Sequence, residues 1–185
     1  FMAGGRRQIF IVFAAFMMVE RFAFTAGDIA LLFLINHLIN IWLAPPIGRL
    51  SCRWGEKRAL SLEYLGLAGI FYAYAFVETA WVAAALYVLD HLFFALAFAM
   101  KTYFQKIADP GDIAPTAAVA FTINHIAAVF LPALLGYLWI VSPGSVFLLA
   151  AAMAATSLGL ALLIPRHPEP GRETVLSRGL PAPAE

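Results

Sequence analysis

Six long apolar runs, separated by short polar breaks, dominate the pattern of hydrophobic and polar positions along this chain. The runs cover residues 8–25, 28–47, 59–77, 81–104, 113–141 and 146–164. Each is close to the ~20 residues that a helix needs to cross a bilayer. Continuous apolar runs, rather than alternation with period two, favour helices over a barrel, because every amide in the bilayer needs an internal partner. The pattern therefore predicts an all-α membrane protein with six transmembrane helices.

Composition supports the same class. Of the 185 residues, 63% are hydrophobic and 12% are charged, and the mean hydropathy is +0.85. A soluble domain is nearer ~45–50% apolar and ~25% charged. The single cysteine, Cys52, excludes a disulfide framework and a cysteine-based metal site. We assign residues 1–165 to one membrane domain and interpret residues 166–185, rich in Pro, Gly, Arg and Glu, as a disordered cytoplasmic tail.

Lysine and arginine are unevenly distributed if the six runs alternate in direction. One side of the membrane then holds Arg6, Arg7, Arg49, Arg53, Lys57, Arg58, Lys101, Lys106, Arg166, Arg172 and Arg178. The other side holds Arg21 alone. Because cytoplasmic loops carry the excess of basic residues, this bias predicts that both termini are cytoplasmic. We expect an integral multi-pass protein of a bacterial inner (cell) membrane.

The basic loop between the second and third runs carries a motif. Its sequence over residues 48–58, GRLSCRWGEKR, resembles the G-x-L-x-D-R-x-G-x-K/R-K/R signature of the major facilitator superfamily. The matching positions are Gly48, Leu50, Arg53, Gly55, Lys57 and Arg58. Cys52 stands where the family has Asp, a departure that fits the weaker copy of the motif in the second half of such transporters.

The resemblance implies a C-terminal half-transporter of two inverted three-helix units. Residues 33–39 (FLINHLI) and 121–127 (FTINHIA) echo each other in the second and fifth runs, which such a repeat would superpose. The chain starts at Phe1 and enters an apolar run almost at once. We interpret it as a fragment that lacks an N-terminal six-helix half; a start at Met2 is the alternative.

Polar residues also occur in the middle of three runs. These candidates for a solute and proton pathway are Asn36, His37, Asp90, His91, Asn124 and His125. Ionisable groups in a membrane normally face a bundle interior or a wet cavity, although interhelical hydrogen bonds of about 1 kcal/mol each are the alternative role. The third and sixth runs lack such pairs, so we expect them at the lipid-facing periphery. No Lys or Arg is expected at mid-depth, which favours a neutral or cationic solute.

Glu20 and Arg21, near the outer end of the first run, are a candidate external gate or a plain ion pair. We expect no catalytic residue, no metal and no cofactor, and therefore no enzyme. The basic residues are spread over membrane-edge loops, so no nucleic-acid partner is expected either.

The function that fits these features is secondary active transport of a small solute by alternating access, coupled to protons. Its partners would be membrane lipids, the missing N-terminal half, the solute and H+. A non-transporting membrane scaffold is one alternative. Another is a membrane redox protein with haem bound by His37, His91 or His125. An intramembrane hydrolase is disfavoured because no serine lies beside a mid-membrane histidine and H-E-x-x-H is absent.

Overall fold

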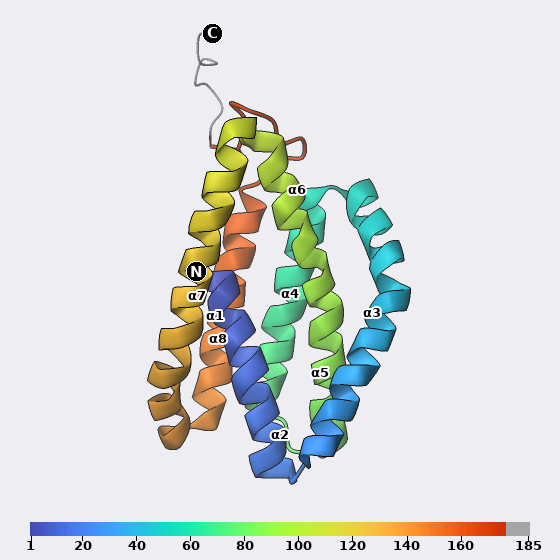
Figure 1. Cartoon of the computed structure of the whole chain (residues 1–185), viewed down its shortest axis with the longest axis vertical. Coiled ribbons are helices and arrows are strands. Elements are labelled where there is room, and N and C mark those ends of the chain that lie inside the picture. The colour runs from blue at the N-terminus through green and yellow to red at the C-terminus, as the bar shows by residue number, and fades with distance from the viewer. Residues whose placement is uncertain (177–185) are drawn as a thin grey trace.

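The computed structural model describes residues 1–176, apart from the side chain of Cys52. The chain forms long helical rods that run side by side (Figure 1). Their elements are α1 (Met2–Gln8), the π-helical η1 (Ile9–Ala14), α2 (Ala15–Phe22), α3 (Ala26–Trp54), α4 (Glu56–Ala75), α5 (Ala80–Phe94), the 3-10 turn η2 (Ala95–Ala97), α6 (Phe98–Ile107), α7 (Pro110–Val141) and α8 (Pro143–Leu162). No β-strand occurs in this part of the chain, which confirms the all-α class.

Five helical segments are long and apolar enough to cross a membrane. They are Met2–Phe22, Ala26–Ser51, Ala80–Ile107, Pro110–Val141 and Pro143–Leu162. The third predicted span corresponds to α4, which is not among the five and carries Glu56, Lys57, Arg58 and Glu63. The prediction of six transmembrane helices in two inverted units therefore stays a prediction.

Local signals explain most helix ends. Thr25 and Asp28 form a capping box at the start of α3, with the Asp28 amide donating to the Thr25 hydroxyl and the Thr25 amide donating to the Asp28 carboxylate. Gly55, at φ +80°, makes the tight turn into α4. The second predicted run ends at residue 47, but α3 continues through Pro45 and Pro46 to Trp54. Each proline removes one backbone hydrogen bond without ending the helix.

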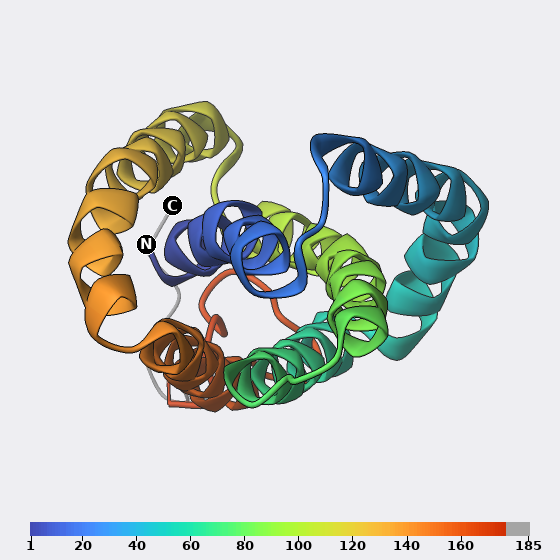
Figure 2. The same ribbon diagram turned by 90° about the horizontal axis from the view of Figure 1, so that it is seen from below.

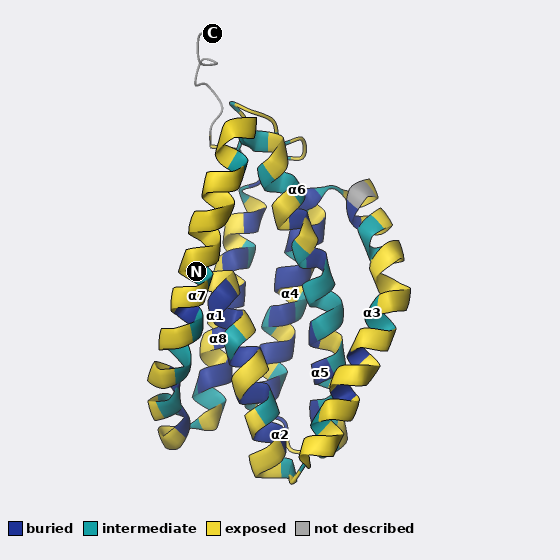
Figure 3. Cartoon of the chain, in the orientation of Figure 1, coloured by how far each residue is buried: buried dark blue, intermediate teal, exposed yellow. Residues whose placement is uncertain are grey.

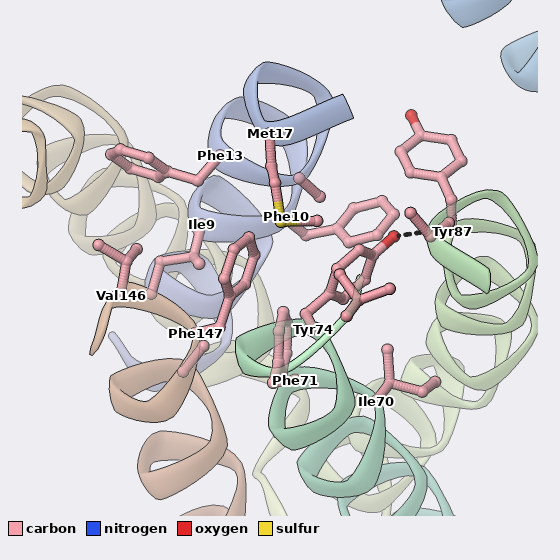
Figure 4. Close-up of a cluster of buried hydrophobic side chains, with 14 of the residues drawn as sticks. Ile9, Phe10, Phe13, Met17, Ile70, Phe71, Tyr74, Tyr87, Val146 and Phe147 are labelled. Carbon is pink, nitrogen blue, oxygen red and sulfur yellow. Dashed lines mark hydrogen bonds between the residues drawn. The ribbon is translucent and has the colours of Figure 1, made fainter. Parts of the chain in front are cut away.

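The elements α1, η1 and α2 form one continuous helical rod, Met2–Phe22, which we call the first rod. The core lies between this first rod, α4, α5 and α8. In Figure 4, Phe10 and Met17 of the first rod face Phe71 and Tyr74 of α4, with Phe147 of α8 beside them. The Tyr74 hydroxyl donates to the carbonyl of Ala83 across the α4–α5 turn, at 3.0 Å.

Helices α4 and α8 pack against each other and lie side by side at one edge of the bundle (Figure 2). Small residues at Ala150, Ala154 and Ala161 of α8 are buried and let the two backbones approach closely. Helix α4 keeps an exposed stripe that includes Leu65 and Tyr72, and α8 keeps one that includes Leu148, Leu149 and Leu160. Each helix therefore buries one face and exposes the other, and the expectation that the third and sixth spans lie at the lipid-facing periphery stays a prediction. Seen end-on, α3 and α7 flank the first rod on opposite sides (Figure 2) and are largely exposed.

The tail after α8 turns back onto the bundle. The Val175 amide donates to the carbonyl of Leu163 at 2.8 Å, and the Tyr103 hydroxyl donates to the carbonyl of Glu173 at 2.6 Å. Residues 166–176 therefore have a defined place, where the sequence predicted disorder, because these hydrogen bonds tie them to α6 and to the end of α8. The remainder of the predicted tail, residues 177–185, lies outside the described residues.

Candidate functional site

A cavity of about 290 Å³ lies between the first rod, α3, α4 and α5. Its polar lining consists of Arg6, Arg7, His37, Asn40, Asp90 and His91. Aromatic residues, among them Phe10, Phe33 and Phe71, form the rest of the wall. The volume is at the small end of the ~300–1,000 Å³ typical of ligand pockets, and an apolar wall with a few convergent polar groups is their usual composition.

Asp90 lies on α5, one turn before the helix changes to the 3-10 geometry of η2. Only 4% of its surface is exposed, and its Oδ1 atom has no hydrogen-bond partner among the described residues. The sequence predicted this residue as a pathway candidate, and the structure places it in the wall of the cavity.

Arg6 lies on the opposite wall and is also 4% exposed. Its guanidinium group stacks over the ring of Tyr64, 4.6 Å from the ring centre, and its Nε donates to the Met2 carbonyl at 3.4 Å. Its Nη1 is buried without a hydrogen-bond partner in the described structure. Arg7 is exposed beside it, 5.3 Å from the ring of Phe94.

The depth of these two arginines corrects the sequence analysis. Helix α1 starts at Met2, six residues before the predicted span, and lies level with the middle of α7 (Figure 1). The contact at Gly4 shows this directly, because a Cβ atom there would lie 2.6 Å from Oδ1 of Asn124. Arg6 and Arg7 therefore lie near the level of the middle of α7 and not at one end of the bundle. The inference that no Arg lies at mid-depth was wrong, and with it the argument for a neutral or cationic solute.

Glu63 of α4 completes the buried charged cluster. It is 2% exposed, and its Oε2 atom has no hydrogen-bond partner among the described residues. Arg6 and Asp90 both act on it electrostatically, yet no salt bridge within 4.0 Å joins the three in the described chain. Sequence reasoning did not count Glu63 as a site residue. The sequence feature that could have identified Glu63 is a carboxylate within the third apolar run, residues 59–77.

Two of the three predicted histidines, His37 and His91, line this cavity, and the third, His125, does not. His91 Nδ1 lies 3.2 Å from Asn36 Nδ2 and 3.2 Å from the Tyr87 carbonyl, and the position of its proton decides which contact is a hydrogen bond. His37 lines the cavity and contacts the Phe33 carbonyl at 2.8 Å through Nδ1. His125 contacts the Phe121 carbonyl in the same way at 2.9 Å, but it is exposed on α7, outside this cavity.

The family model for the Major Facilitator Superfamily matches residues 1–184. This chain belongs to the Major Facilitator Superfamily. No curated protein and no solved structure shows a significant match to it. The chain is thus part of a membrane transporter of the major facilitator kind, and its apolar helices agree with an integral membrane protein.

At the end of this major facilitator chain that lies away from the tail, Glu20 and Arg21 do not pair with each other within the described structure. Instead Glu20 Oε2 accepts a hydrogen bond from Trp139 Nε1 at 2.9 Å, which ties α2 to α7. Arg21 lies 5.9 Å from the ring of Phe22. The ion pair that the sequence analysis considered is therefore not observed, and the role of a gate stays a prediction.

The motif loop of this major facilitator chain joins helix ends on the tail side. Gly55 makes the turn between α3 and α4, while Gly48 lies inside α3 with open space around it. Lys57 Nζ donates to the Leu162 carbonyl at 2.7 Å, and Glu56 pairs with Lys106 of α6 at 2.6 Å. Arg53 and Arg58 are exposed.

Proposed function

We propose that this chain takes part in secondary active transport of a small solute by alternating access, coupled to protons. The cavity between the first rod, α3, α4 and α5 is the solute site, and Asp90 is the principal proton-binding residue. One observation carries the proposal: a buried carboxyl group with an unpartnered oxygen lines the same cavity as two arginines.

The coupling follows from the cost of burying charge. An ionised carboxylate without a partner is expensive away from water, so Asp90 gains from taking up a proton or from a neighbouring positive charge. A solute in the cavity changes the electrostatic field at Asp90, and protonation of Asp90 changes the field at the solute. The two binding events are then reciprocally linked. Arg6, Glu63, His37 and His91 modulate the same field.

Helix irregularities at the cavity support movement between two states. The π-helical η1 begins two residues after Arg7, and η2 begins four residues after His91. Such interruptions are common at functional sites and at the binding sites of transporters. The two arrangements of the rods would exchange about these segments.

Matched contacts support the two inverted three-helix units. Asn36 of α3 reaches across to His91 of α5, while Asn124 of α7 packs against Gly4 of α1. The echoing segments thus use equivalent asparagines to contact the first helix of the other unit. His37 and His125 form the same contact with the carbonyl four residues earlier.

The surroundings belong to the same proposal. An N-terminal six-helix half and membrane lipids would cover the exposed faces of α3 and α7, in a bacterial inner membrane with both termini in the cytoplasm. Asn124, His125 and the Glu20–Trp139 contact would then lie along the path rather than at the solute itself.

Proton movement in proteoliposomes tests the proposal. The intact transporter, its Asp90→Asn variant and an Asp112→Asn control, altered at an exposed position of α7, would be reconstituted with a pH-sensitive dye inside. We expect solute-dependent proton flux in the wild type and the control, and its loss in Asp90→Asn. Proton flux that survives in Asp90→Asn would remove Asp90 from the coupling mechanism. Solute flux without any proton movement would overturn the coupling itself.

A further inference from the structure

We propose that the transported solute is a small anion whose carboxylate or equivalent acidic group binds Arg6. This inference rests on the proposed transport function and names its substrate class. The first observation is that Arg6 is almost fully buried, lines the cavity and keeps Nη1 without a hydrogen-bond partner in the described structure. A buried guanidinium donor without an acceptor is costly, and a bound oxyanion would supply the acceptor.

The neighbours of Arg6 leave its Nη1 atom without a hydrogen-bond partner in the described structure. Tyr64 covers one face of the guanidinium plane, which leaves its edge for hydrogen bonding. The nearby carboxylates, Glu63 and Asp90, act on it at a distance but form no salt bridge with it within the described residues. A planar fork of N–H donors matches a carboxylate or phosphate in a bidentate manner, which an ammonium group cannot do.

Arg6 also contributes to the walls of two cavities. It lines the central cavity and a second cavity of about 500 Å³ on the side of the tail, together with Tyr64, Tyr103 and Thr174. A guanidinium group between two cavities can hold an anion that arrives from either one, as alternating access requires.

The charge of the site links anion binding to protons. Arg6 and Arg7 contribute two positive charges, and Glu63 and Asp90 contribute two negative charges when both are ionised. With neutral histidines the site is therefore neutral when both carboxyls are ionised and carries two positive charges when both are protonated. An anion gains most from the protonated form, so anion and protons should move together.

The groups that face Arg6 from each packed element are Glu63 and Tyr64 of α4, Asp90 of α5, Tyr103 of α6, His37 of α3 across the cavity, Asn124 of α7 near Gly4, and Ser157 of α8. Together with His91 of α5 in the wall of the same cavity, the carboxyl and imidazole groups of this set are Glu63, Asp90, His37 and His91. A proton on any of them makes the charge of the site more positive.

Charge-selective labelling of a cysteine in the cavity tests the proposal without knowledge of the solute. Asn40→Cys and Ile11→Cys, each in a Cys52→Ser background of the intact transporter, place single thiols in the cavity wall. Each would react with an anionic sulfonate methanethiosulfonate and with a cationic trimethylammonium methanethiosulfonate. The ratio of the two rates, relative to free cysteine, reports the local potential and cancels the thiolate fraction.

We expect the ratio to favour the anionic reagent, to increase from pH 8 to pH 5.5, and to fall by roughly ten-fold on Arg6→Gln. Arg6→Lys should retain most of the ratio, and Arg172→Gln, altered on the exposed tail, should leave it unchanged. A ratio that favours the cationic reagent at both pH values, or that ignores Arg6→Gln, would overturn the anion proposal. Failure of both reagents at both positions would overturn it too, because an anion of similar size could not enter.

The result is separable from transport itself. Proton-coupled flux that depends on Asp90, combined with a cation-selective cavity, would leave the proposed function intact and exclude only the anion. An anion-selective cavity without solute-dependent proton flux would refute the coupling and leave a static anion site.

Discussion

Gly66 of α4 lies against the ring of Phe93, and this contact sets how closely α4 approaches α5. A Cβ atom at residue 66 would overlap a ring carbon of Phe93. Gly69, one turn further along α4, has nothing within 4 Å of an added Cβ.

These two glycines form a matched pair of substitutions. Gly66→Ala should lower the free energy of unfolding by ~1–3 kcal/mol, because the core at Phe93 is overfilled. Gly69→Ala should leave it unchanged or raise it by up to ~1 kcal/mol through helix propensity. Thermal unfolding of the purified transporter in detergent measures both. Equal midpoints for the two variants would show that Phe93 yields without cost.

At the scale of single residues, the sequence predicted the polar layer in part. Polar pairs inside apolar runs indicated Asp90, Asn36 and His91, and the structure brings Asn36 and His91 within 3.2 Å of each other. Arg6 was misplaced because a basic pair before an apolar run is typical of a membrane edge. The contact of Gly4 with Asn124 shows that Arg6 lies near the level of the middle of α7.

At the scale of helices, the polar gaps between the predicted runs agree with observed helix ends. The gap between the runs 81–104 and 113–141 contains the end of α6 at Ile107 and the start of α7 at Pro110. The π-helical η1 and the 3-10 turn η2 contain no Gly, Pro or polar residue that would mark an irregularity, because all their residues are apolar. We attribute both irregular segments to tertiary packing, which the pattern of hydrophobic residues along the chain does not reveal.

The folded tail offers a prediction at this scale. Tyr103→Phe removes the hydroxyl that donates to the Glu173 carbonyl, a bond worth about 1 kcal/mol. Amide exchange at Val175, which donates to Leu163, should therefore accelerate by roughly five-fold. Tyr72→Phe, on the exposed stripe of α4, serves as the control. Hydrogen exchange with mass spectrometry measures both, and unchanged protection in Tyr103→Phe would mean that other contacts hold the tail.

For the molecule as a whole, burial separates the helices into two groups. The first rod, α4 and α8 supply most of the core, whereas α3 and α7 present apolar faces to the outside (Figure 3). The sequence could not predict this division, because the patterns of α3, α4, α7 and α8 show no pronounced polar face that would tell the exposed side from the buried one. The small residues of α8 and the charged cluster around Glu63 decide it.

The distribution of basic residues over the two ends of the bundle predicts its orientation. On the tail side lie Arg49, Arg53, Lys57, Arg58, Lys106, Arg166 and Arg172, and on the other side lies Arg21. Moving Arg6 and Arg7 to mid-depth leaves this bias large, so the tail side should be cytoplasmic. Exposed turns mark each end, at Glu78 between α4 and α5 and at Asp109 between α6 and α7.

Single cysteines at these turns, in a Cys52→Ser background, should therefore differ in accessibility. A membrane-impermeant maleimide added to intact cells should label Glu78→Cys and spare Asp109→Cys. After permeabilisation both should react, which controls for local reactivity. The opposite pattern would place the basic loop outside and would mean that the charge bias does not orient this bundle. Equal labelling of both in intact cells would show that these two turns do not lie on opposite sides of a sealed membrane.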